Sequence, residues 1–132
     1  MTDIRWKQRF QNLKKANANL TETYDCIKTN GINKIYTMAL IQAFEISFEL
    51  SWKTIKDYLE YNGINVDTPR AAIKEGFSGN ILKDGQGWIE MMETRNKTSH
   101  TYKEDFAKQT AEEILNKYLP LLKELETTLE TK

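Results

Sequence analysis

Residues 41–59 read IQAFEISFELSWKTIKDYL, and their apolar side chains recur at the three- and four-residue spacing of an α-helix. One apolar stripe consists of Ile41, Phe44, Phe48, Trp52, Ile55 and Leu59. A second apolar set lies on other faces and consists of Met38, Leu40, Ile46 and Leu50. A helix that is apolar on more than one side needs more than one packing partner. We therefore predict a helix over about 33–62 that is either the centre of a bundle or part of a subunit interface.

Helical spacing also runs through the segment that precedes this stretch. From Trp6 to Ile27 the stripe steps alternately by four and three residues, with one polar interruption at Asn17. A single polar residue in such a stripe is typical of a packing seam whose register it sets. Asn30-Gly31 then predicts the end of this first helix, because glycine readily adopts the left-handed conformation of a helix cap.

The remainder of the chain predicts three more helices and no strand, because no segment alternates between apolar and polar residues. Thr68-Pro69 is typical of an N-cap followed by the first residue of a helix, and Pro120 predicts a kink or a break in the last one. The expected elements are a short helix to about 75, a glycine-rich connection over 76–87, a helix from about 86 or 88 through Arg95, and a helix over about 106–129.

These elements predict an all-α fold, an antiparallel four-helix up-and-down bundle with an extra short helix. We expect five helices in total, in one domain over residues 1–132. Hydrophobic residues make up 39% of the chain and aromatic residues 11%, enough for a packed core. The single cysteine, Cys26, excludes an internal disulfide and a cysteine-rich metal site.

Charge and hydropathy limit the classes of partner. Nineteen basic and nineteen acidic residues give a formal net charge of zero. This balance argues against a general nucleic-acid coat, whose affinity comes mostly from phosphate neutralisation, but it permits one small basic site. The first residues lack the apolar core of a signal peptide, and no apolar run approaches membrane-spanning length. We therefore expect a soluble, cytoplasmic protein with no membrane partner.

Candidate chemistry is concentrated in residues 95–102, which read RNKTSHTY. This stretch holds the only histidine, His100, five residues after Arg95. Imidazole transfers protons near neutral pH, and a guanidinium can hold a phosphate through two hydrogen bonds. Such a pair suits phosphodiester chemistry without a metal, and we expect neither a metal nor a cofactor. Between Glu93 and Glu104 the charged residues are Arg95, Lys97 and Lys103, which form a local basic island.

Arg95 also has a purely structural explanation. It continues an apolar helical stripe made of Trp88, Met91 and Met92, so its charge must be paired, exposed at an interface or placed in a functional cleft. A structural ion pair with Glu45 or Glu49 of the second helix would satisfy it. Those two glutamates could instead form a solvated or interfacial ladder with Lys53 at helical spacing.

The relative placement of His100 is open as well. On a continuous helix it would lie about 140° around the axis from Arg95, so the two side chains would not share a face. They can converge if the helix ends between Thr98 and Thr101, or if they meet across a two-fold axis. His100 can be structural rather than catalytic, and Tyr102 can either cap the core beside it or expose a hydroxyl for modification.

The chain resembles the HEPN superfamily of small helical-bundle proteins and, within it, the nucleotidyltransferase substrate-binding group. Four segments carry the resemblance: 5–10 (RWKQRF), 42–54 (QAFEISFELSWKT), 69–70 (PR) and 88–102 (WIEMMETRNKTSHTY). Their order and spacing extend over nearly the whole chain. No single segment would be specific alone.

The family motif is an arginine, a polar residue, a few further residues and a histidine, which Arg95, Asn96 and His100 match. Toxin-type members continue with one spacer and a tyrosine, which Tyr102 matches. The resemblance implies a homodimer whose two motifs form one composite cleft, and a partner that is a minimal nucleotidyltransferase. In toxin-type pairs that partner can transfer AMP onto the tyrosine, which would block the cleft by size and negative charge.

The resemblance also implies roles for the residues of the motif. In metal-independent RNA cleavage, His100 would transfer protons and Arg95 would stabilise charge on the phosphorane-like transition state. Asn96 could orient the phosphate or the histidine. Lys97 and Lys103 would add local attraction for the substrate.

Three functions remain compatible with the sequence. The first is a toxin-type, metal-independent ribonuclease that is silenced by AMP transfer to Tyr102. The second is a non-catalytic subunit that binds a nucleotide or substrate for a two-component nucleotidyltransferase, which the zero net charge and the apolar excess of the second helix favour. The third is a purely structural bundle, which would make the complete motif a coincidence. We prefer the first and keep the second as the alternative.

Overall fold

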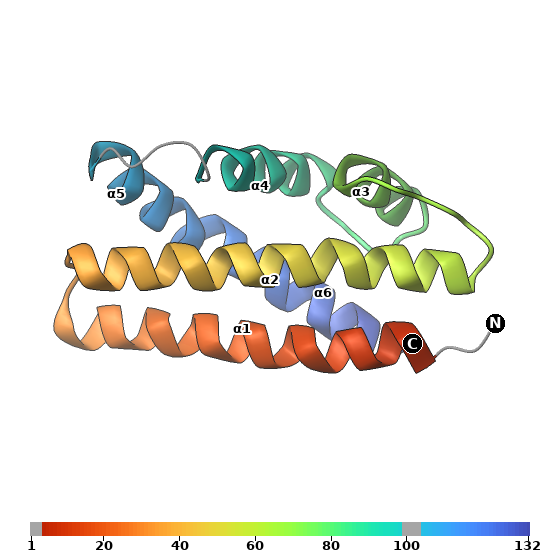
Figure 1. The fold of residues 1–132 in the computed structure, drawn as a ribbon, viewed down its shortest axis with the longest axis horizontal. Helices are drawn as coiled ribbons and strands as arrows, with labels where there is room; N and C mark the ends of the chain where they lie inside the picture. The colour runs from red at the N-terminus through yellow and green to blue at the C-terminus, as the bar shows by residue number, and fades with distance from the viewer. Residues whose placement is uncertain (1–3, 99–103) are drawn as a thin grey trace.

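The computed structural model describes residues 4–98 and 104–132. Two long helices, α1 (Ile4–Asn30) and α2 (Lys34–Tyr61), lie side by side and run in opposite directions (Figure 1). The short α3 (Pro69–Ser78) and α4 (Gly85–Thr98) lie along the side of α2 that faces away from α1 (Figure 1). None of the helices in the described ranges is long and apolar enough to cross a membrane.

The chain ends in one continuous helical segment that crosses behind α2 in this view (Figure 1). It consists of α5 (Glu104–Glu113), the π-helical turn η1 (Ile114–Tyr118) and α6 (Leu119–Glu130). Counted as one helix, this segment brings the total over the described residues to five, with no strand. The predicted all-α bundle with one extra short helix is confirmed.

Local sequence signals explain where the helices begin and end. The side chain of Asn33 accepts a hydrogen bond from the Tyr36 N–H at 2.8 Å and caps α2. The hydroxyl of Thr68 accepts one from the Ala71 N–H at 3.1 Å and caps α3. Gly31 directly follows the last residue of α1 and has a φ of +82°, a conformation that few other residues adopt without strain. The sequence predicted these boundaries because each depends on neighbouring residues only.

The glycine-rich connection is shorter than the sequence predicted. Helix α3 runs to Ser78 and α4 begins at Gly85, so the connection covers 79–84 instead of 76–87. Gly76 lies inside α3 and is buried, and a Cβ there would come within 3.3 Å of Ile55 and 3.4 Å of Leu82. This glycine therefore permits close packing between helices and does not break one.

Helix α2 is the centre of the bundle, because α1, α3, α4, α5 and α6 all contact it. Its side chains Phe44, Phe48 and Ile55 are almost fully buried. Apolar side chains nevertheless remain on its free face, and the most exposed are Ile35, Met38 and Ile46. The predicted position at the centre of the bundle is thus confirmed, and a role at a subunit interface stays a prediction.

The first helix contains the predicted polar seam. Asn17 is buried between α1 and α6, where its Nδ2 donates to Glu126 Oε2 at 3.1 Å and lies 3.5 Å from the carbonyl of Leu122. These contacts fix the register of α1 against α6.

Pro120 changes the last helix without ending it. Because proline has no N–H, the carbonyl four residues earlier has no helical partner. One residue before Pro120, the N–H of Leu119 bonds to the carbonyl of Ile114, five residues back, as in a π-helix. The predicted kink or break is therefore a π-helical turn inside a continuous helix. This turn carries Tyr118, whose ring is buried and stacks on Phe44.

Burial of Tyr118 generates a prediction about alkaline stability. Desolvation raises the pKa of its hydroxyl from 10 to about 12. A folded-state pKa above the unfolded value stabilises the fold fully below pH 10, and that stabilisation disappears as the pH rises to about 12. We expect urea unfolding to show a steeper loss of stability over this range in the wild type than in Tyr118→Phe. Since both proteins contain the same lysines, parallel curves would contradict the assignment.

Candidate functional site

Helix α4 presents the candidate arginine. It starts at Gly85, and the N–H of Gly87 donates to Asp84 Oδ1 at 2.9 Å. The apolar stripe that precedes Arg95 is buried and consists of Trp88, Met91 and Met92. Arg95 continues that stripe at the carboxyl-terminal turn of α4, where its positive charge also complements the helix dipole.

The structure joins Arg95 to α2 through Glu45. Arg95 Nη1 lies 3.4 Å from Glu45 Oε2, and the two side chains are 23% and 27% exposed. The hydroxyl of Thr98 donates to the same carboxylate oxygen at 2.6 Å and lies 2.7 Å from the Arg95 carbonyl. Glu45 thus holds both the guanidinium and the last described turn of α4.

Of the two glutamates that the sequence left open, the structure selects Glu45 as the partner of Arg95. Glu49 accepts a hydrogen bond from Trp52 Nε1 of its own helix at 2.7 Å. The sequence did not single out Thr98 as a site residue. The available signal was its spacing, since a residue three positions after Arg95 lies on the same face of a helix.

The other predicted site residues fall into two groups. Asn96 and Lys97 lie on the last turn of α4 and are exposed to solvent. His100, Tyr102 and Lys103 lie outside the described residues, so their predicted roles stay predictions. The described part of α4 ends at Thr98.

The arrangement suits anion binding. A guanidinium carries several N–H donors in a fixed plane that matches the geometry of phosphate. A neighbouring carboxylate orients that plane, and partial exposure leaves the pair within reach of a ligand.

The comparison with protein families then decides the family. The model described as "Nucleotidyltransferase substrate binding protein like" matches residues 8–131, which include the whole candidate motif. The chain belongs to the nucleotidyltransferase substrate-binding protein family. The resemblance found in the sequence is therefore confirmed.

Two solved structures share the fold of this family member. A Thermus thermophilus protein of known crystal structure is 28% identical, with a TM-score of 0.78 over 89% of this chain and 98% of that one. A tri-AMPylated Shewanella oneidensis HEPN toxin, solved in complex with an MNT antitoxin, gives a TM-score of 0.78 over the full length of both chains. Its identity is 12%, so this second likeness concerns the fold.

One curated relative adds a likeness in sequence. The probable ribonuclease HepT of Haemophilus influenzae is 35% identical over 72 residues, which are 51% of this chain and 49% of the relative. The chain thus spans about half the length of the curated relative that it matches.

The exposure of the Arg95–Glu45 pair predicts a small contribution to stability. We expect Arg95→Met to lower the free energy of unfolding by less than about 1 kcal/mol, as is usual for partly exposed ion pairs. The matched control is Arg9→Met, because Arg9 Nε lies 2.7 Å from Oδ2 of Asp57, whose side chain is 3% exposed. Leaving that carboxylate unpaired should cost about 3 kcal/mol. Urea unfolding measures both, and equal losses would make Arg95 a structural residue.

Proposed function

We propose that this protein is the HEPN subunit of a pair with a minimal nucleotidyltransferase and that it is a toxin-type, metal-independent ribonuclease. The observation that carries the proposal is a partly exposed Arg95, oriented by Glu45, five residues before the only histidine. Family membership, the partial likeness to a probable ribonuclease and the fold shared with a HEPN toxin support it.

The proposed reaction is an internal transesterification of RNA. His100 accepts the proton of the 2′-hydroxyl, whose oxygen attacks the adjacent phosphorus. The bond to the 5′-oxygen breaks, and that oxygen receives a proton from His100 of a second copy, which leaves a 2′,3′-cyclic phosphate and a 5′-hydroxyl. Arg95 stabilises the added negative charge in the transition state. Asn96 orients the phosphate or the histidine, and Lys97 and Lys103 attract the RNA backbone locally.

A second copy of this chain completes the cleft in this proposal. Helix α2 exposes Ile35 by 75%, Met38 by 62% and Ile46 by 49%. Exposed apolar side chains of this size on one helix favour a protein interface. Ile46 directly follows Glu45 in the chain, so the apolar surface adjoins the Arg95–Glu45 pair. We infer that the homodimer covers this face and brings the two motifs together.

The nucleotidyltransferase partner provides the proposed regulation. It transfers AMP from ATP to the phenolic oxygen of Tyr102 and releases pyrophosphate. The added phosphodiester carries negative charge two residues from His100, so it repels RNA and fills the cleft.

The alternative is a non-catalytic subunit that binds a nucleotide or substrate for the same partner. The specific observation in its favour is the formal net charge of zero, which leaves RNA attraction to the local basic island. This alternative predicts a stable complex and no turnover by the chain alone.

The ribonuclease proposal makes a direct prediction about His100. Loss of its imidazole should reduce cleavage of a mixed RNA pool by at least about 100-fold, because general acid–base catalysis contributes that much. The thermal midpoint of His100→Ala should stay at the wild-type value. Lys15→Ala, which removes an exposed cation from α1, is the matched control and should cleave normally. Cleavage by His100→Ala at the wild-type rate would refute the proposed role.

The regulatory proposal predicts a change in intact mass. After incubation with ATP, Mg²⁺ and the partner nucleotidyltransferase, the wild type should gain whole AMP units. Tyr102→Phe should gain none, while Tyr61→Phe, which removes an exposed tyrosine of α2, should react like the wild type. An unmodified wild type that still forms a stable complex would favour the non-catalytic alternative.

A further inference from the structure

Tyr118 contacts the residue before Arg95 on α4 and the residue before Glu45 on α2. Its hydroxyl oxygen lies 2.8 Å from Oγ1 of Thr94, which directly precedes Arg95 on α4. Its ring stacks on Phe44, which directly precedes Glu45 on α2, with ring centroids 5.6 Å apart and planes inclined by 20°. One buried side chain thus touches α4 and α2 next to the residues through which they form the candidate site.

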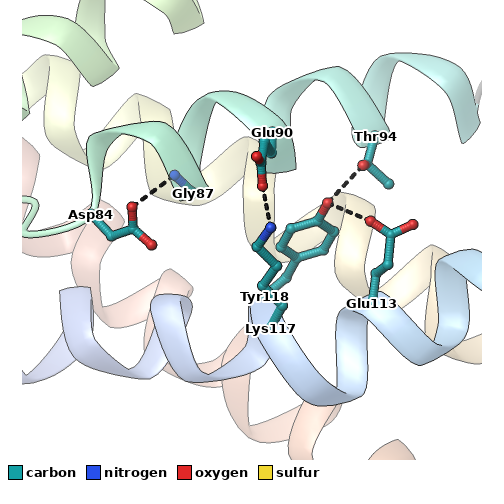
Figure 2. A network of polar contacts seen from close by, with 7 residues as sticks. All are labelled: Asp84, Gly87, Glu90, Thr94, Glu113, Lys117 and Tyr118. Carbon is teal, nitrogen blue, oxygen red and sulfur yellow. Dashed lines mark hydrogen bonds and ion pairs between the residues drawn. The ribbon is translucent and has the colours of Figure 1, made fainter.

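The Tyr118 hydroxyl has two hydrogen-bond partners but only one proton to donate, and this fixes the direction of both bonds. The Tyr118 hydroxyl donates its proton to Glu113 Oε2 at 2.9 Å, so the hydroxyl of Thr94 must donate to the Tyr118 oxygen (Figure 2). The result is a chain of two hydrogen bonds that ends on a carboxylate. Bonds to an ionised acceptor are shorter and stronger than neutral ones, so this chain resists displacement of Thr94.

The π-helical turn makes this chain geometrically possible. Glu113 and Tyr118 are five residues apart, and in a regular α-helix their side chains would lie about 140° apart around the axis. The wider turn of η1 reduces that angle and lets the Glu113 carboxylate meet the Tyr118 hydroxyl. Turns of this kind occur frequently at functional sites in other helices.

A second contact joins the same two elements without touching the candidate site. Lys117, also on η1, donates to Glu90 of α4, and this hydrogen bond lowers the pKa of the Glu90 carboxyl (Figure 2). Both side chains are 40% or more exposed, so the pair contributes little to positioning. The buried contact through Tyr118 is the one that sets the last turn of α4.

We propose that Tyr118 is a positioning residue for Arg95. Through Thr94 and Phe44 it fixes the relative placement of α4 and α2 at the point where Arg95 meets Glu45. The catalytic consequence rests on the proposed ribonuclease function, whereas the effect on the Arg95 guanidinium does not. Without the hydrogen-bond chain, the last turn of α4 shifts and the guanidinium leaves the geometry that the transition state requires.

Steady-state RNA cleavage tests the catalytic consequence. Tyr118→Phe and Thr94→Val should each lower kcat by about 10- to 100-fold and change KM by less than about twofold, because small misplacements of catalytic groups cost that much. Thr94→Ser keeps the donor and should retain the wild-type kcat. Asn17→Ala weakens the buried seam between α1 and α6 and controls for lost stability. If Tyr118→Phe reduces kcat no more than Asn17→Ala does, Tyr118 has no positioning role.

A second readout is independent of cleavage. The NMR signal of the Arg95 Nε–Hε group is identified by its absence in Arg95→Lys. This signal should shift in Tyr118→Phe and Thr94→Val and stay in place in Asn17→Ala. An unmoved signal in the first two variants overturns the positioning role. A shifted signal in a protein whose wild type cleaves no RNA supports the positioning role and refutes only the ribonuclease function.

Discussion

Helices pack against several sides of α2, and this packing positions the other elements of the described structure. All of the other α-helices in the described ranges contact α2, and its Phe44 and Phe48 side chains are buried in the core. Because the Phe44 ring of α2 stacks on Tyr118 of the last helical segment, the next residue, Glu45, lies at the neighbouring edge of α2, where Arg95 of α4 meets it. The packing of the core therefore also positions the residues of the candidate site. The polar groups at the site, Arg95, Thr98 and Glu45, lie at the boundary where this core meets solvent.

Two ion pairs of this protein differ in the burial of their carboxylates, and this difference sets how much each pair should contribute to stability. Arg9, whose side chain is 32% exposed, pairs with Asp57, whose side chain is only 3% exposed, so loss of Arg9 leaves a buried carboxylate without compensation. Arg95 and Glu45 are both about one quarter exposed, so their interaction is screened and contributes little to stability. In the proposed reaction, Glu45 stays beside the Arg95 guanidinium and orients it toward the phosphate. With a net charge of zero, the protein attracts an anion only where local charges favour it, and the basic stretch around Arg95 is such a place.

The parts of this structure that depend on local chemistry could be read from the sequence, and the parts that depend on distant contacts could not. The cap at Thr68 depends only on the residues that follow it within one turn, and the sequence predicted it. Pro120 indicated a disturbance in the last helix, but the sequence did not reveal that this disturbance is a π-helical turn inside a continuous helix. Gly76 looked like part of a connection, because nothing in its own segment reveals the side chains of α2 and of the following connection that press against it. At the site, the sequence predicted that Arg95 continues an apolar stripe. The pairing with Glu45 and the participation of Thr98 depend on how α4 packs against α2, which the sequence does not reveal.

In the proposed function, the Arg95 guanidinium acts on a phosphodiester without a metal. The most direct test is RNA cleavage by the purified protein in excess EDTA, with the wild type compared to Arg95→Lys. Lysine keeps the charge but cannot form the planar, two-point contact, so we expect cleavage by the wild type and a loss of about 100-fold or more in the variant. Equal rates for the two proteins, or a wild-type activity that EDTA abolishes, would contradict this proposal.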